Sequence, residues 1–244
     1  MALALYHGDC LAVLPHFAAG SIGLILADLP YGTTKSPHDT PIDLALLWPQ
    51  LRRVAKPDAA ILLFACQPFT TDLIVSNRRD FRYDLVWRKD RGGASGHLNA
   101  RKMPLRRHES ICVFYRRAPV YHPQWEDGEP NHSRGTGAAA SRGGVYGGYA
   151  HVAADPEDRR KHPGSDLYFP AVPRAQRRHP QEKPVPLLRW LIRAYSDPGA
   201  VVLDCTTGSG ATGEACADEG RDFIGIEKDA DHYATAHRRL YFKA

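Results

Sequence analysis

The segment from residue 200 to residue 227 constrains the fold more than any other part of the chain. It reads as a buried apolar strand, a glycine-bearing turn, a helix and a second strand that ends in Glu227. Such a unit is the building block of a parallel sheet covered by helices. Its glycines let a ligand approach the backbone, and an acid after the second strand can accept two ribose hydroxyls. We therefore predict an α/β fold with a nucleoside-type site here, with a plain tight turn as the alternative.

A second candidate site lies near the other end of the chain, at Asp28-Leu29-Pro30-Tyr31. These residues follow an apolar run that reads as a buried strand, and ends of parallel strands are where α/β proteins place ligands. Asp28 can accept a hydrogen bond from an amine, Pro30 stiffens the turn, and Tyr31 offers a flat face to a planar ring. The set suits a nucleobase presented by its exocyclic amine. An ordinary strand and turn would contain the same residue types.

Charge and cysteine usage narrow the class of partner. Residues 88–183 hold eighteen Lys and Arg against ten Asp and Glu, whereas the rest of the chain holds fourteen against seventeen. A basic middle favours a polyanion, with nucleic acid first, although a solvated basic surface would have the same composition. The five cysteines are scattered, which predicts reduced thiols in a cytoplasm. No zinc site, membrane span or signal peptide is expected.

Local patterns predict the remaining elements, because apolar runs indicate buried strands and apolar spacings of three and four indicate helices. Strands are expected at residues 3–7, 23–27, 59–65, 83–87, 110–115, 200–204 and 223–227. Helices are expected at residues 11–17, 43–54, 68–75, 187–195, 211–219 and 229–239, with Asp9 as the N-cap of the first.

Two segments in the middle lack these patterns. Residues 88–107 are basic and rich in glycine, and residues 116–181 mix arginines, tyrosines and glycines without a period. Such a composition fits a chain that lies on phosphates and stacks bases, and also fits a flexible linker. The candidate nucleic-acid contacts are Lys89, Arg91, Arg101, Lys102, Arg106, Arg134 and Arg142.

The order of the motifs resembles that of the β-class amino-methyltransferases of DNA, which are circularly permuted. That family has a D-P-P-Y-type motif, a target-recognition region, an H-P-x-x-K-P segment and a D-P-F-x-G-S-G motif. This chain has Asp28-Leu29-Pro30-Tyr31, a basic insert, His179-Pro180-Gln181-Glu182-Lys183-Pro184 and Asp204-Cys205-Thr206-Thr207-Gly208-Ser209-Gly210, in that order. Leu29 stands where the family has proline, and Thr206 stands where it usually has phenylalanine. The resemblance covers nearly the whole chain except residues 116–173.

The resemblance implies a Rossmann-like, S-adenosylmethionine-dependent methyltransferase sheet with helices on both faces and a long inserted target-recognition region. Residues 1–115 would form the catalytic half, residues 116–178 the largely irregular insert, and residues 179–244 the cofactor-binding half. The implied catalytic residues are Asp28, Pro30 and Tyr31. The implied cofactor residues are Asp9 at the adenine, Glu227 at the ribose, Lys183 at the carboxylate, and Asp204, Thr206, Gly208, Ser209 and Gly210 in the turn.

The reaction that the resemblance implies is methyl transfer from S-adenosylmethionine to the exocyclic N6 amine of a flipped adenine in duplex DNA. Aspartate at the start of the motif favours adenine, since serine is commoner in N4-cytosine enzymes, which are the first alternative. A DNA-binding protein that has lost catalysis, and methylation of RNA or protein, are the others. Duplex DNA is the expected partner, without a metal or a membrane. A homodimer, and pairing with a restriction enzyme, are left open.

Overall fold

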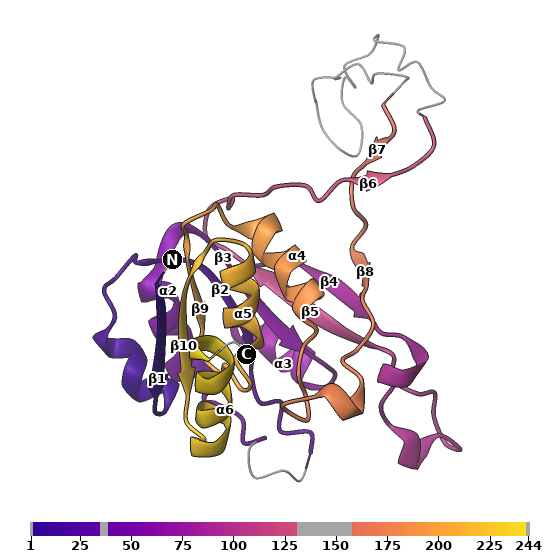
Figure 1. Cartoon of the computed structure of the whole chain (residues 1–244), viewed down its shortest axis with the longest axis horizontal. Helices are drawn as coiled ribbons and strands as arrows, with labels where there is room; N and C mark the ends of the chain where they lie inside the picture. Colours follow the sequence, from indigo (N-terminus) through magenta and orange to yellow (C-terminus); the bar gives the residue numbers. More distant parts are fainter. Residues whose placement is uncertain (1, 35–38, 131–157, 243–244) are drawn as a thin grey trace. The chain divides into compact units, whose positions relative to one another are not determined.

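The computed structural model describes residues 2–34, 39–130 and 158–242 (Figure 1). The chain forms two compact units, one of Met1–His122 with Ser165–Ala244 and one of Pro123–Gly164. The first unit contains an eight-stranded sheet in the order β1-β10-β9-β2-β3-β5-β4-β8, and the second contains the pair β6-β7. Arg134 and Arg142 lie outside the described residues. None of the described helices has the length and apolar character that a membrane crossing requires.

The elements of the first unit alternate between strands and helices along most of the chain. In order they are β1 (Leu3–His7), α1 (Cys10–Val13), β2 (Ile22–Asp28), α2 (Leu44–Val54), β3 (Ala55–Ala65), α3 (Phe69–Ser76), β4 (Phe81–Arg88), β5 (His108–Phe114), β8 (Asp166–Tyr168), α4 (Val185–Tyr195), β9 (Val201–Asp204), α5 (Ala211–Asp218), β10 (Asp222–Glu227) and α6 (Ala230–Tyr241). Every helix and strand expected from the sequence is present, with shifted ends. The sequence patterns missed β8 and the second unit's β6 (Glu126–Asp127) and β7 (Arg160–Lys161).

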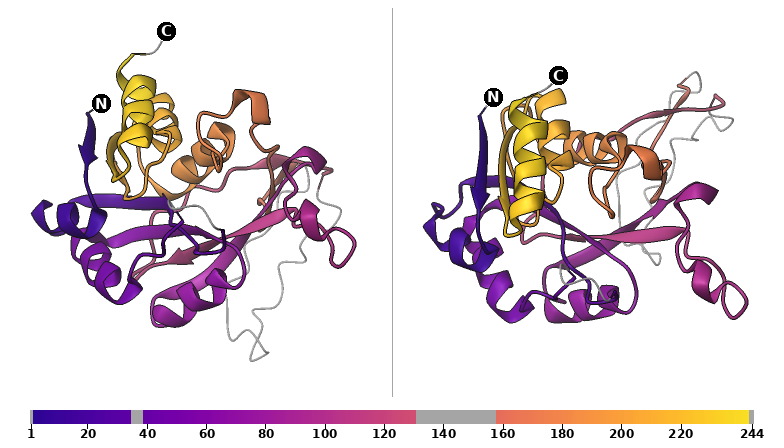
Figure 2. Two further views of the ribbon diagram at one scale, coloured as in Figure 1. Left: turned by 90° about the horizontal axis from the view of Figure 1, so that it is seen from below. Right: turned by 60° about the horizontal axis from the view of Figure 1, so that its bottom comes forward.

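The central strands are continuous apolar runs because helices cover both faces of the sheet. Along β2, Ile25 and Ala27 enter the core beneath α1, α2 and α3. Their neighbours Leu24 and Leu26 enter the opposite core, beneath α4 and α5. In Figure 2, left, the purple helices lie on one side of the sheet and the orange and yellow helices on the other. The predicted α/β class is thus confirmed.

Parallel pairing brings strands from the two ends of the chain side by side in one half of the sheet, from the edge strand β1 to β2. His7 of β1 pairs with Glu227 of β10, and Ile25 of β2 pairs with Leu203 of β9. The chain leaves β9 towards β10 on one side and leaves β2 towards β3 on the other. The carboxyl ends of β9 and β2 therefore form a topological switch point, where open α/β sheets bind ligands.

Candidate functional site

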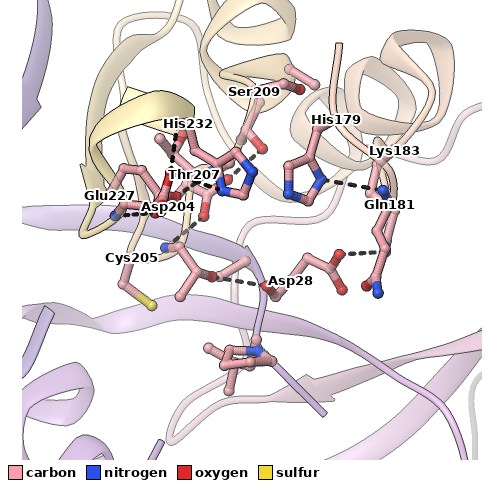
Figure 3. A pocket seen from close by; sticks show the side chains of 18 of the residues that line it. Asp28, His179, Gln181, Lys183, Asp204, Cys205, Thr207, Ser209, Glu227 and His232 are labelled. Carbon is pink, nitrogen blue, oxygen red and sulfur yellow. Dashed lines mark hydrogen bonds and ion pairs between the residues drawn. The ribbon is translucent and has the colours of Figure 1, made fainter. Parts of the chain in front are cut away.

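A cavity of about 230 Å³ lies at the carboxyl ends of β1, β10, β9 and β2 (Figure 3). Both ends of the chain line it, as the two sequence motifs predict. The predicted site residues that line it are Asp9, Asp28, Pro30, Lys183, Asp204, Thr206, Gly208, Ser209 and Glu227. Tyr31 and Gly210 are the predicted residues that do not.

Glu227, at the end of β10, presents a carboxylate to the cavity. The side chain is buried, and its two oxygens accept backbone N–H groups from Gly208 at 2.8 Å and from Asp229 at 2.9 Å. Each carboxylate oxygen has a second lone pair, so both can still accept a ligand hydroxyl. The same contacts fix the glycine turn against the end of β10. Asp9 follows the neighbouring strand β1 and caps α1 by accepting the N–H of Leu11 at 2.8 Å, as predicted.

Gly210 shapes the turn from outside the cavity. Its φ of 77° lies in the left-handed region, and an added Cβ would lie 3.1 Å from the Cα of Ala236 in α6. A side chain at this position would therefore push the turn away from α6. Gly210 contributes the close packing of the turn, whereas Gly208 and Ser209 contribute to the cavity wall.

Asp204 is a buried carboxylate beneath the turn. One oxygen accepts the N–H of Thr206 at 3.1 Å, and the other accepts the hydroxyl of Thr212 at 2.6 Å. Burial raises the pKa of Asp204 to about 7, and the two hydrogen bonds offset only part of that effect. The carboxyl group of Asp204 therefore ionises near neutral pH. The hydroxyl of Thr206 donates to the backbone carbonyl of Asp28 at 3.0 Å. This bond joins the turn after β9 to the end of β2.

Asp28 has close ionic and hydrogen-bond partners in the structure. The ammonium of Lys183 lies 2.5 Å from Asp28 Oδ2, and the hydroxyl of Tyr31 donates to Asp28 Oδ1 at 2.5 Å. Burial raises the pKa of Asp28, and Lys183 offsets part of that rise. Lys183 keeps only 8% of its side chain exposed, whereas Asp28 keeps 22%. Leu29, which stands at the family's proline position, is buried in the core beneath α1 and α2.

Glu109 of β5 completes this buried charge network and was not among the predicted site residues. Its carboxylate lies 3.1 Å from Lys183 Nζ and 2.5 Å from Lys89 Nζ. Burial alone would raise the pKa of Glu109, but the two ammonium groups outweigh burial and lower it to about 2. Burial likewise opposes the charge of Lys183, but Asp28 and Glu109 raise its pKa to about 12. Lys183 thus lies between two carboxylates, and Lys89 pairs with one of them.

Asp39 is a second residue that the sequence motifs missed. Its carboxylate accepts the backbone N–H groups of Tyr31 at 2.7 Å, Gly32 at 2.9 Å, Thr33 at 2.9 Å and Thr34 at 2.7 Å. These four bonds hold the chain that follows Asp28 in one conformation, and they help to lower the pKa of Asp39 despite its burial.

The Tyr31 ring packs on Phe69 of α3. The ring centroids lie 5.3 Å apart with an interplanar angle of 24°. The phenol is therefore fixed at both ends, by this stack and by its bond to Asp28. The Tyr31 ring is thus held in a fixed orientation, in which a planar ligand could stack on it.

Arg239 of α6 holds residues 179–184 over the cavity. Its guanidinium donates to Glu182 at 2.6 Å and to the Ser209 hydroxyl at 3.1 Å, and it also pairs with Glu214. Glu182 precedes Lys183, so this anchor positions Lys183 at Asp28. No sequence motif had pointed to Arg239.

The predicted nucleic-acid contacts separate into two groups in the described part of the chain. Arg91, Arg101, Lys102 and Arg106 are exposed in the segment between β4 and β5. Lys89 instead pairs with Glu109 and keeps only 12% of its side chain exposed. The structure does not bring Lys89 together with the exposed cations. Among the described residues, no cluster of His, Cys, Asp or Glu could hold a metal ion.

Comparisons with known proteins match this chain to DNA methylases and DNA methyltransferases. A family described as DNA methylase matches residues 22–238. The DNA adenine methyltransferase YhdJ of Escherichia coli (strain K12) is 30% identical over 255 aligned residues, which cover 98% of this chain and 83% of YhdJ. The structure of an M1.HpyAVI-SAM complex matches with a TM-score of 0.62 at 18% identity, covering 98% of this chain and 100% of that one. The cytosine-N4-specific PvuII DNA methyltransferase matches with a TM-score of 0.67 at 16% identity, covering 100% and 87%.

Proposed function

Because the chain belongs to the DNA methylase family, we propose that it transfers a methyl group from S-adenosylmethionine to the exocyclic N6 amine of an adenine in duplex DNA. One observation carries this proposal. A single cavity is lined both by Asp28, an acceptor for an amine, and by the Glu227 carboxylate with its glycine turn. A cofactor site and an amine site therefore adjoin without an intervening wall.

The donor groups of the cavity fit S-adenosylmethionine. Glu227 would accept the ribose hydroxyls, and Asp9 would accept from the adenine amine. The open backbone at Gly208, with ordinary van der Waals space around it, would lie along the methionine part. The sulfonium of this cofactor supplies an electrophilic methyl group.

Asp28 would act on the attacking amine. An exocyclic amine is a poor nucleophile because its lone pair is conjugated with the ring, and positive charge grows on nitrogen as the new bond forms. Each Asp28 oxygen keeps a lone pair besides those used by Lys183 and Tyr31, so Asp28 and a carbonyl of the turn can accept the two N–H bonds. Lys183 is then a positioning residue: it holds Asp28 in place, and its positive charge opposes the rise that burial causes in the pKa of Asp28.

Access to the base requires flipping. A base stacked in a duplex cannot reach an acceptor at the bottom of a cavity, and flipping costs a few kcal/mol. Tyr31 would stack on the extruded base. The exposed cations between β4 and β5 would hold phosphates, and so would the insert of residues 116–178. In the sequence, this insert separates a catalytic half, residues 1–115, from a cofactor-binding half, residues 179–244. The proposed activity would be carried out on DNA in the cytoplasm.

The identity of the base is tested by nucleoside analysis. The chain is expressed in a host that lacks DNA methylation, the DNA is digested, and nucleosides are quantified by mass spectrometry. N6-methyladenine is expected, because aspartate opens the motif and the relative YhdJ bears the name of an adenine methyltransferase. N4-methylcytosine would instead support the alternative, which has an N4-specific structural neighbour. Unmodified DNA would favour a DNA-binding protein without catalysis.

A further inference from the structure

The β4–β5 loop, residues 89–107, projects from the sheet edge that holds Asp28. β5 runs antiparallel to β3, and Ser110 at its start pairs with Ala65 at the end of β3. Asp28 at the end of β2 pairs with Phe64 of the same strand β3. The β4–β5 loop therefore leaves the sheet beside the carboxyl ends of β2 and β3. Figure 1 shows it as the purple projection beyond the ends of β4 and β5.

Backbone hydrogen bonds give the β4–β5 loop a defined shape. At its base the N–H of Lys89 donates to the carbonyl of Arg107 at 2.8 Å, and further out Ser95 and Arg106 exchange two bonds at 2.9 and 3.0 Å. The tip is a 3-10 turn, His97–Asn99. The loop is thus an ordered projection whose tip does not depend on apolar packing.

Leu98 at this tip is fully exposed, with a relative exposure of 101%, and Met103 nearby is 56% exposed. A single exposed leucine needs no explanation by itself. Here, however, the surrounding residues are all neutral or basic: residues 91–107 contain no Asp or Glu. The exposed cations of the loop are Arg91, Arg101, Lys102, Arg106 and Arg107.

The exposed cations of the loop fit a polyanion, and duplex DNA is the polyanion that the proposed function requires. The exposed arginines and lysine would rest on phosphates and bring the tip onto the base stack. An apolar side chain that enters a base step unstacks it and fills the space that a departing base leaves. Leucine and methionine are among the side chains that do this.

We propose that Leu98 is the wedge that opens the duplex at the target base pair and occupies the vacated position in the stack. This inference rests on the proposed function, because a wedge is needed only where a base must leave the duplex for the cavity. Leu98 does not contact the reacting atoms. Its contribution is confined to the flipping step, and Met103 would pack beside it against the opened step.

The test compares two duplexes that differ only at the partner of the target base. In one the target is paired, and in the other it faces an abasic site, so that little work is needed to extrude it. Leu98→Ala should lower single-turnover methyl transfer on the order of tenfold on the paired duplex and leave the second duplex nearly unaffected. Leu98→Met should restore most of the rate. Leu46→Ala, which truncates another exposed leucine in α2, should match the wild-type chain on both duplexes.

Two results would overturn the wedge: wild-type rates for Leu98→Ala on the paired duplex, or an equal loss on both duplexes. Fluorescence of 2-aminopurine at the target position reads flipping without chemistry. A fluorescence rise that Leu98→Ala abolishes would support the wedge even if the wild-type chain transferred no methyl group, and that outcome would contradict only the proposed function. No rise with the wild-type chain would contradict the wedge.

Discussion

Replacement of Asp204 by asparagine should make the free energy of unfolding less sensitive to pH. The pKa of Asp204 is raised from 3.8 to about 7 in the folded protein. A carboxyl group whose folded pKa is raised stabilises the fold fully below the unfolded pKa, and this stabilisation is lost as pH rises through the folded pKa. Above about pH 7 the folded protein contains the ionised carboxylate in a buried position, and its desolvation lowers the free energy of unfolding. Asparagine has no such ionisation, and it can still accept from Thr206 and donate to Thr212.

The magnitude follows from the width of the pH window. Each pKa unit corresponds to about 1.4 kcal/mol. Between about pH 5 and pH 8.5 the wild-type chain should therefore lose about 3 kcal/mol of unfolding free energy relative to Asp204→Asn, since about two units of that interval lie below the folded pKa. Urea denaturation of both chains at the two pH values measures the difference, with equal m-values as the control for two-state unfolding. A difference that does not change with pH would show that Asp204 is already ionised at pH 5.

Two further predictions concern the ligands. Glu227→Gln should weaken S-adenosylmethionine binding roughly tenfold in calorimetry, because one acceptor of a ribose hydroxyl becomes a donor; unchanged affinity would remove Glu227 from the site. The double variant Arg101→Gln/Lys102→Gln should reduce the slope of log affinity for DNA against log salt by about two, since each cation releases about one counterion. The matched variant Arg78→Gln/Arg79→Gln removes two exposed charges before the start of β4 and should leave the slope unchanged, so equal effects of the two variants would argue against the β4–β5 loop.

The sequence predicts elements well where burial imposes a simple pattern. The strands β2, β3 and β9 are covered on both faces, so each is a continuous apolar run that stands out from its surroundings. The turn after β9 and the aspartate that ends β2 are recognisable because they directly follow such apolar residues. By contrast, β8 is three residues long and has one buried side chain, Leu167. A strand of that length shows no period.

The buried charge network could not be predicted from local patterns. Lys183, Glu109 and Asp28 come from three separate parts of the chain, and only the register of the sheet and the anchor at Arg239 bring them together. The role of Asp39 could not be predicted for a related reason. Its partners are backbone N–H groups, which every residue has, so no side-chain pattern reveals them.

The central claim is that Asp28 assists the attack of the amine. Asp28→Ala should lower methyl transfer from tritiated S-adenosylmethionine to duplex DNA on the order of a hundredfold or more, because an acceptor that strengthens in the transition state is lost. The fold should persist, since Lys183 keeps Glu109 as a partner at 3.1 Å, and calorimetry should give near-wild-type cofactor affinity. Asp58→Ala, at an exposed aspartate near the start of β3, should transfer at the wild-type rate. Near-wild-type turnover by Asp28→Ala would contradict the assignment of this carboxylate to catalysis.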